Sequence, residues 1–289
     1  MTKYFKWSPK ETSPVELRRK LFILAEDRSG STWLNATLNQ NPEIFMAREL
    51  LTQTGRREEM ISLRDFDLWL HYYLRRKMDF KSARGLSVRE VNRLIEHPDQ
   101  PRYTGFKAVY KQFLTGFDWM KFIHHHKDAH FIILERKDFF ASTLSALIAD
   151  LTKVWHSQPS QVFRFRIPPD KLVRNFRERL MYRRMMEDLL GAFPGLSYQR
   201  IYYEDLFAPE TLIGLQEQLG LKNPLLPAHF RKVTSDQRIL KEVENLPEIL
   251  NLREDLIQKV AVNFGYSPED LLGLEKQMNP LYSRLLQQL

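Results

Sequence analysis

The residues of this chain best suited to binding an anion form a short turn after its first apolar run. Residues 21–25 have the length and composition of a buried strand, and apolar residues resume at helical spacing from Trp33. The turn between them contains one cation, one glycine and three hydroxyl side chains: Arg28, Ser29, Gly30, Ser31 and Thr32. A strand, a turn of small residues and a helix N-terminus together present backbone N–H groups to a phosphate, and an arginine adds a charge-assisted contact. This stretch predicts a phosphate site, with an ordinary polar turn and its helix N-cap as the alternative.

The turn differs from the phosphate loop of nucleotide triphosphatases. The glycine-lysine pair of that loop occurs nowhere in the chain. We therefore expect phosphate binding without that lysine and without the magnesium ion that accompanies it. Gly30 is expected to let the phosphate approach closely, because glycine has no Cβ.

A second candidate anion site follows the strand predicted at residues 129–135. Its nearly continuous apolar run is typical of a strand buried on both faces of a parallel sheet. Arg136 comes directly after this strand, and Ser145 lies on the helix predicted at residues 139–151. Ligands of open α/β sheets bind at the carboxyl ends of the strands, so this pair predicts a second phosphate contact. The alternative is that Arg136 caps the strand and Ser145 packs inside the helix.

Together these two motifs resemble those of the sulfotransferases that use PAPS, adenosine 3′-phosphate 5′-phosphosulfate. Residues 28–33 resemble the family's 5′-phosphosulfate loop, although Asp27 stands where the family usually has proline. Arg136 and the later Ser145 resemble its 3′-phosphate motif. Three further segments resemble the bacterial carbohydrate and glycolipid branch, and with them the resemblance covers most of residues 21–245: residues 105–107, residues 203–206 with 219–221, and residues 231–235 with 244–245.

The resemblance implies a PAPS site without metal, with PAP as the product. The residues that it implies for binding PAPS are Arg28, Ser29, Gly30, Ser31, Thr32, Trp33, Arg136, Ser145 and Lys232.

Sulfuryl transfer also needs a base for the acceptor hydroxyl and cations near the leaving group. Glu49 resembles the base of the carbohydrate branch and is expected where the chain returns over the carboxyl edge of the sheet; a surface carboxylate paired with Arg48 is the alternative. Lys107, near the end of a strand predicted beside the phosphate turn, and Arg28 complete the predicted catalytic set. The histidines at 124–126 precede the strand that ends before Arg136, so we expect them at the opposite edge of the sheet.

The elements that position these residues alternate between short buried strands and helices. Strands are predicted at residues 21–25, 102–110, 129–135 and 198–203, and helices at 31–40, 58–77, 113–125, 139–151, 170–193, 209–219 and over much of 243–289. This alternation predicts an α/β protein with a three-layer, P-loop-like fold, in which a short central parallel sheet is flanked by helices. We expect a loose N-terminal arm at residues 1–20 and a single domain at residues 21–289.

Composition limits the partners and the compartment. The 289 residues carry a net charge of +8, which suits nucleic acid, anionic membranes or polyanionic small ligands. The cations are spread along the chain without a basic tail, which argues against nucleic acid. The chain has no cysteine, no apolar N-terminal leader and no apolar run long enough to cross a membrane, so we expect a cytoplasmic protein; peripheral membrane contact stays open.

The expected function is transfer of a sulfuryl group from PAPS to a carbohydrate, a glycolipid or another aliphatic alcohol. Gly105, Phe106 and Lys107 stand where the phenol and steroid branch of the family places its histidine. Trp155, His156 and the basic loop at 163–166 are expected walls of the acceptor pocket. The alternatives are a nucleotide-dependent phosphotransferase with an atypical loop and a non-catalytic module that binds PAP.

Overall fold

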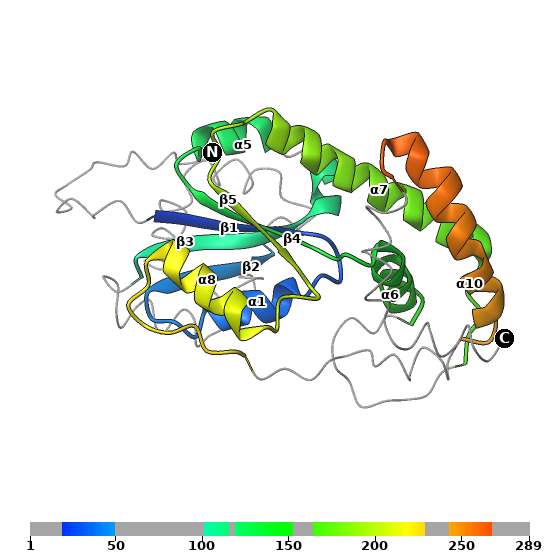
Figure 1. Cartoon of the computed structure of the whole chain (residues 1–289), viewed down its shortest axis with the longest axis horizontal. Helices are drawn as coiled ribbons and strands as arrows, with labels where there is room; N and C mark the ends of the chain where they lie inside the picture. The colour runs from blue at the N-terminus through cyan, green and yellow to red at the C-terminus, as the bar shows by residue number, and fades with distance from the viewer. Residues whose placement is uncertain (1–18, 50–100, 116–118, 153–163, 229–242, 268–289) are drawn as a thin grey trace, which may run out of the picture.

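Five parallel strands form the centre of the computed structural model, which describes residues 19–49, 101–115, 119–152, 164–228 and 243–267 (Figure 1). The strands lie in the order β2-β3-β1-β4-β5. Their bounds are β1 Arg19–Ala25, β2 Ile44–Glu49, β3 Tyr103–Val109, β4 His130–Glu135 and β5 Tyr198–Tyr202. The predicted parallel sheet is confirmed, and because all strands run the same way, their carboxyl ends meet at one edge.

Helices cover both faces of this sheet. The described helices are α1 Ser31–Leu38, α5 Trp119–His125, α6 Phe139–Thr152, α7 Pro169–Gly191, α8 Pro209–Leu219 and α10 Leu246–Asp255, with the shorter segments η3 Tyr110–Thr115, η4 Leu256–Ala261 and η5 Val262–Phe264. Figure 1 shows α1 and α8 on one side of the sheet and α5 and α7 on the other, which confirms the predicted three layers.

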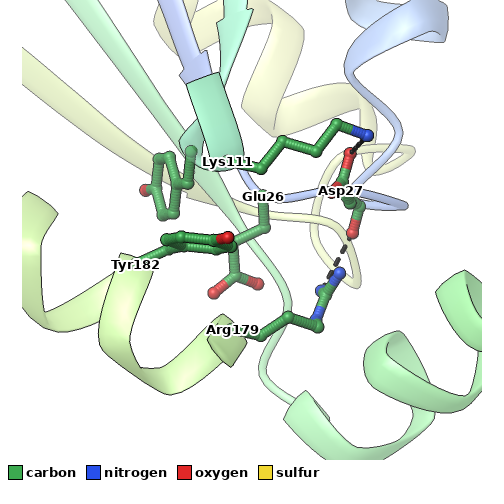
Figure 2. A pocket seen from close by; sticks show the side chains of 6 residues that line it. Glu26, Asp27, Lys111, Arg179 and Tyr182 are labelled. Carbon is green, nitrogen blue, oxygen red and sulfur yellow. Dashed lines mark hydrogen bonds and ion pairs between the residues drawn. The ribbon is translucent and has the colours of Figure 1, made fainter. Parts of the chain in front are cut away.

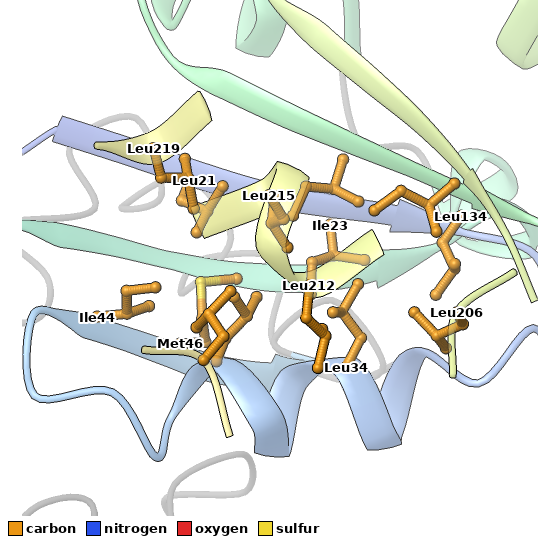
Figure 3. Packing of buried hydrophobic residues seen from close by; sticks show 14 of the residues in the cluster. Leu21, Ile23, Leu34, Ile44, Met46, Leu134, Leu206, Leu212, Leu215 and Leu219 are labelled. Carbon is orange, nitrogen blue, oxygen red and sulfur yellow. The ribbon is translucent and has the colours of Figure 1, made fainter. Parts of the chain in front are cut away.

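Alternation along β1 explains how the two faces are filled. Leu21, Ile23 and Ala25 pack toward α1 and α8, and Figure 3 shows the leucine-rich core that they share with those helices. Phe22 and Leu24 point the other way, into an aromatic cluster beneath α5 and α7. Side chains of a strand alternate between faces, so Glu26, two residues after Leu24, points to the same face as Leu24, toward α7.

Two parts of the element prediction differ from the structure. No element was predicted for residues 44–49, which form the edge strand β2, paired with β3. Its apolar run is short and passes directly into charged residues, which left little strand signal. The helix predicted at 113–125 is instead the 3₁₀ turn η3 and the helix α5. Gly116 and Asp118, both poor helix formers, lie between them in the sequence.

The start of β1 differs from the prediction, and several predicted features lie outside the described residues. β1 begins at Arg19, whose N–H donates to the carbonyl of Arg102 at 3.0 Å, so two residues expected in the arm belong to the sheet. The rest of the arm, the helix predicted at 58–77, Trp155, His156 and Lys232 lie outside the described residues. Within the described ranges, no helix is both long and apolar enough to cross a membrane.

Candidate active site

The turn after β1 is held by its own hydrogen bonds. The hydroxyl of Ser29 donates to the carbonyl of Glu26 at 2.7 Å, and Ser29 is fully buried. Arg28 and Gly30 both have positive φ, 66° and 82°. Arginine rarely adopts this conformation, which is evidence that the surrounding contacts fix the turn. The structure therefore uses the hydroxyl proton of Ser29 to shape the turn.

Gly30 is needed for a different reason from the one expected. A Cβ at this position would lie 2.9 Å from side-chain carbons of both Tyr203 and Leu206. The side of Gly30 that we expected a phosphate to approach is covered by these two side chains. Glycine is required because it combines a left-handed backbone with close packing against the segment that follows β5.

Replacing Gly30 with alanine should therefore lower the free energy of unfolding by about 1–3 kcal/mol, because it combines backbone strain with crowding. Urea denaturation followed by circular dichroism measures this change. Gly214, in α8, has open space around its Cβ position and is the matched control: G214A should be neutral or stabilising. Equal stability of G30A and the wild type would contradict this explanation.

Helix α1 begins directly at the turn, and the helix itself supplies no acceptor for its first N–H groups. Its first internal hydrogen bond runs from the N–H of Leu34 to the carbonyl of Gly30 at 3.1 Å. The preceding N–H groups have no partner within the helix, its first turn has no acidic residue, and Gly30 supplies no side-chain cap. The start of α1 therefore carries partial positive charge.

Lys107 adds a full positive charge at the same place. Its ammonium donates to the hydroxyl of Thr32 at 2.9 Å and lies 3.5 Å from that of Ser31, and the residue is only 4% exposed. An ammonium beside the N–H groups at the start of a helix is suited to binding an anion. The prediction that Lys107 lies near the end of a strand beside the turn is confirmed.

The second candidate phosphate motif meets the first. Nε of Arg28 donates to the hydroxyl of Ser145, on α6, at 3.3 Å, across 117 positions of sequence. Burial, and next the neighbouring cation of Arg136, lower the pKa of Arg28 from its ordinary value. An anion bound between these two cations would favour the charged form of Arg28.

The side chain of Arg136 has one donor, its Nε, that the described residues do not satisfy. Its guanidinium lies 4.4 Å from the centre of the Tyr203 ring, and a carboxylate oxygen of Glu204 lies 3.7 Å from its Nε, beyond hydrogen-bond range. This Nε is buried and makes no hydrogen bond within the described part of the chain. An oxyanion at this position would supply the missing acceptor.

Asp27 is neutralised on the side of the turn away from α1. Its carboxylate pairs with the ammonium of Lys111 at 3.1 Å, and its backbone carbonyl accepts from Arg179 at 3.0 Å. Figure 2 shows these contacts in a small pocket that Glu26 and Tyr182 also line. The carboxylate of Asp27 therefore has its own cation, and does not by itself oppose an anion at the turn.

The remaining predicted residues are placed as follows. Glu49 ends β2, and its Cα is in register with that of Lys107, while its side chain lies outside the described part. Trp33 donates from its indole N–H to the carbonyl of Ala228 at 2.8 Å. The histidines end α5 before β4 begins, at the edge of the sheet away from the turn, as predicted.

Two arginines of α7 were missed by the sequence analysis. Arg179 and Arg183 are 7% and 6% exposed and reach beneath the turn. The helix was predicted at residues 170–193, but neither arginine was given a role. A signal was present, because both fall on the apolar stripe of α7, whose other members are Leu172, Phe176, Leu180 and Met186.

Comparisons with known proteins return similar solved structures and nothing else. No protein-family model matches the chain, and no curated protein matches it either. The sulfotransferase from Alicyclobacillus acidocaldarius is similar with 14% identity and a TM-score of 0.47, over 92% of this chain and 99% of that one. The sulfotransferase domain of the curacin biosynthetic pathway is similar with 17% identity and a TM-score of 0.42, over 93% and 98%. The sulfotransferase domain of the olefin synthase of Synechococcus PCC 7002 has 17% identity and a TM-score of 0.40, over 89% and 99%. At these values the likeness assigns neither a donor nor an acceptor.

Proposed function

We propose that this protein is a sulfotransferase that takes a sulfuryl group from PAPS and transfers it to a hydroxyl group. The observation that carries this proposal is the contact between Arg28 and Ser145. It joins the two segments that resemble the family's 5′-phosphosulfate and 3′-phosphate motifs. One nucleotide with anionic groups at both ends needs donors from two such segments at one place.

The site fits such a ligand at both ends. The start of α1, Thr32 and Arg28 are our proposed partners of the 5′-phosphosulfate. Arg136, whose buried Nε makes no hydrogen bond to the described residues, and Ser145 are our proposed partners of the 3′-phosphate. The other residues that we propose for this nucleotide are Ser29, which shapes the turn, and Gly30, Ser31, Trp33 and Lys232.

In the proposed reaction the acceptor oxygen forms a bond to sulfur while the bond from sulfur to the bridging oxygen breaks. The negative charge that develops on this oxygen leaves with PAP, and the acceptor proton passes to a base. Lys107 and Arg28 are suited to stabilise the developing charge, because both are held at the positive end of α1. Glu49 is our proposed base, since β2 brings it into register with Lys107.

The proposed acceptor is the hydroxyl of a sugar, a glycolipid or another aliphatic alcohol. Its support is that Lys107 lies near the end of β3, at the position where the phenol and steroid branch of the family has a histidine. The nucleotide site is proposed to need no metal.

Titration calorimetry with PAP in EDTA tests the proposed donor site. The wild-type protein should bind PAP without divalent metal. R136A should weaken this binding by about 1.5–3 kcal/mol, roughly ten- to a hundredfold, because it removes a charge-assisted contact. K137A is the matched control: Lys137 is adjacent but pairs with Asp205 at 2.8 Å, so PAP affinity should stay near that of the wild type.

The other candidate functions give different results in the same experiment. Binding that strictly requires magnesium would favour a nucleotide-dependent phosphotransferase. Binding of PAP without any transfer from PAPS would favour a non-catalytic module. Absence of PAP binding by the wild type would overturn the proposal.

A further inference from the structure

A buried ion pair beneath the candidate site holds the main chain of Arg136 from both sides. Nε of Arg183, on α7, pairs with a carboxylate oxygen of Glu26 at 2.5 Å, and the two side chains are 7% and 3% exposed. The other carboxylate oxygen of Glu26 accepts the backbone N–H of Arg136 at 3.2 Å. Nη2 of Arg183 donates to the backbone carbonyl of the same residue at 2.9 Å.

These contacts link the turn after β1 to the segment after β4, and they lie beneath the candidate phosphate site rather than in it. Glu26 directly precedes the turn that carries Arg28, and Arg136 follows β4. The pair therefore fixes where the second phosphate motif lies relative to the first. Arg179, one helical turn earlier on α7, makes a parallel connection from the carbonyl of Asp27 to the hydroxyl of Ser142, on α6.

Stability alone is a weak explanation for this arrangement. Removing both charges from water costs several kcal/mol per ion, and apolar side chains of similar size often stabilise a core equally well. Burial by itself would lower the pKa of Arg183, but the nearby carboxylates of Glu26 and Glu135 outweigh it and raise the pKa. Arg183 is thus kept charged, with its directed donors available for positioning.

We propose that Arg183, acting through Glu26 and the backbone of Arg136, is a positioning residue that makes the two phosphate contacts of one nucleotide cooperative. This inference rests on the proposed function. A ligand with both phosphates requires the two motifs at a fixed separation, whereas a ligand with one phosphate uses either motif alone. The ion pair of Arg183 and Glu26 should therefore affect the affinity for a ligand with both phosphates much more than the affinity for a ligand with one phosphate.

Calorimetry with three nucleotides tests this inference on the full chain: PAP, adenosine 5′-phosphate and adenosine 3′-phosphate. R183K keeps the charge beside Glu26, but a single ammonium cannot reproduce the two directed bonds of the guanidinium. We expect R183K to lower PAP affinity about tenfold and the affinity for either monophosphate by less than about threefold. R200K is the matched control, because Arg200 pairs with Glu187 and Glu135 and contacts neither motif in the described structure, so all three affinities should be retained.

The ratio of the affinity for PAP to the affinity for each monophosphate distinguishes a positioning role of Arg183 from a general contribution to stability. A variant that is merely less stable loses affinity for all three nucleotides together, and this result with R183K would overturn the inference, as would unchanged PAP affinity. If R183K does not fold, E26Q gives the same test, since it keeps the shape of the side chain and removes the charge that orients Arg183. Failure of the wild type to bind PAP would overturn the proposed function together with the inference.

Discussion

Replacing Lys107 with methionine should lower the turnover of sulfuryl transfer by roughly 10²–10³-fold, the usual effect of removing one preorganised donor from developing charge. Lys107 is buried and holds its ammonium 2.9 Å from the hydroxyl of Thr32, at the start of α1. In the proposed reaction, negative charge on the bridging oxygen increases as the bond to sulfur breaks. The interaction with Lys107 is therefore stronger in the transition state than in the bound donor.

Steady-state rates with labelled PAPS measure this effect, with kcat and KM determined separately. Methionine has nearly the length of lysine, so the fold should be retained. K259M is the matched control, because Lys259, on η4, is 74% exposed and pairs with Asp255 at 2.9 Å, so turnover should be retained. A rise in KM with unchanged kcat would contradict the assignment, because it would mean that Lys107 only helps to bind the donor.

Much of the fold could be predicted because its central strands are chemically distinct. β1 and β4 lie inside the sheet and consist of nearly uninterrupted apolar residues, the pattern of a strand covered on both faces. β2 lies at the edge and passes into charged residues after Ala47, so the same signal is short there. The strand could be recognised only from its pairing with β3.

The meeting of the two anion motifs was also predictable, because parallel strands bring their carboxyl ends to one edge. The buried arginines of α7 that lie beneath these motifs could not be predicted. Arg179 and Arg183 occupy apolar-stripe positions of α7, but arginine on a helix is usually solvated, and no sequence rule indicates the buried carboxylate opposite it. Gly30 shows the same limit: its type was informative, but Tyr203 and Leu206, which explain it, are distant in sequence.

Glu49 is our proposed base for the acceptor hydroxyl, and replacing it with glutamine should lower turnover roughly 10²–10⁴-fold, the range for loss of a general base. Glutamine keeps the size of the side chain but cannot accept the acceptor proton. PAP binding does not involve this proton, so PAP affinity should stay near that of the wild type. E43Q makes the same change just before β2, where Glu43 accepts from the N–H of Lys222 at 2.8 Å, and should retain activity.

A panel of acceptors tests the role of Glu49 with a second measurement, the class of hydroxyl that the protein modifies. Labelled PAPS is incubated with glycans, glycolipids, phenols and acyl-carrier alcohols, using the wild type and E49Q. Aliphatic hydroxyls are much weaker acids than phenols, whose pKa is about 10, so they depend more on a base. We expect the wild type to modify aliphatic hydroxyls and E49Q to lose this transfer while calorimetry still detects PAP. Transfer by the wild type to phenols alone would contradict both the acceptor class and the assignment of Glu49, because a phenol ionises readily enough to react without that carboxylate.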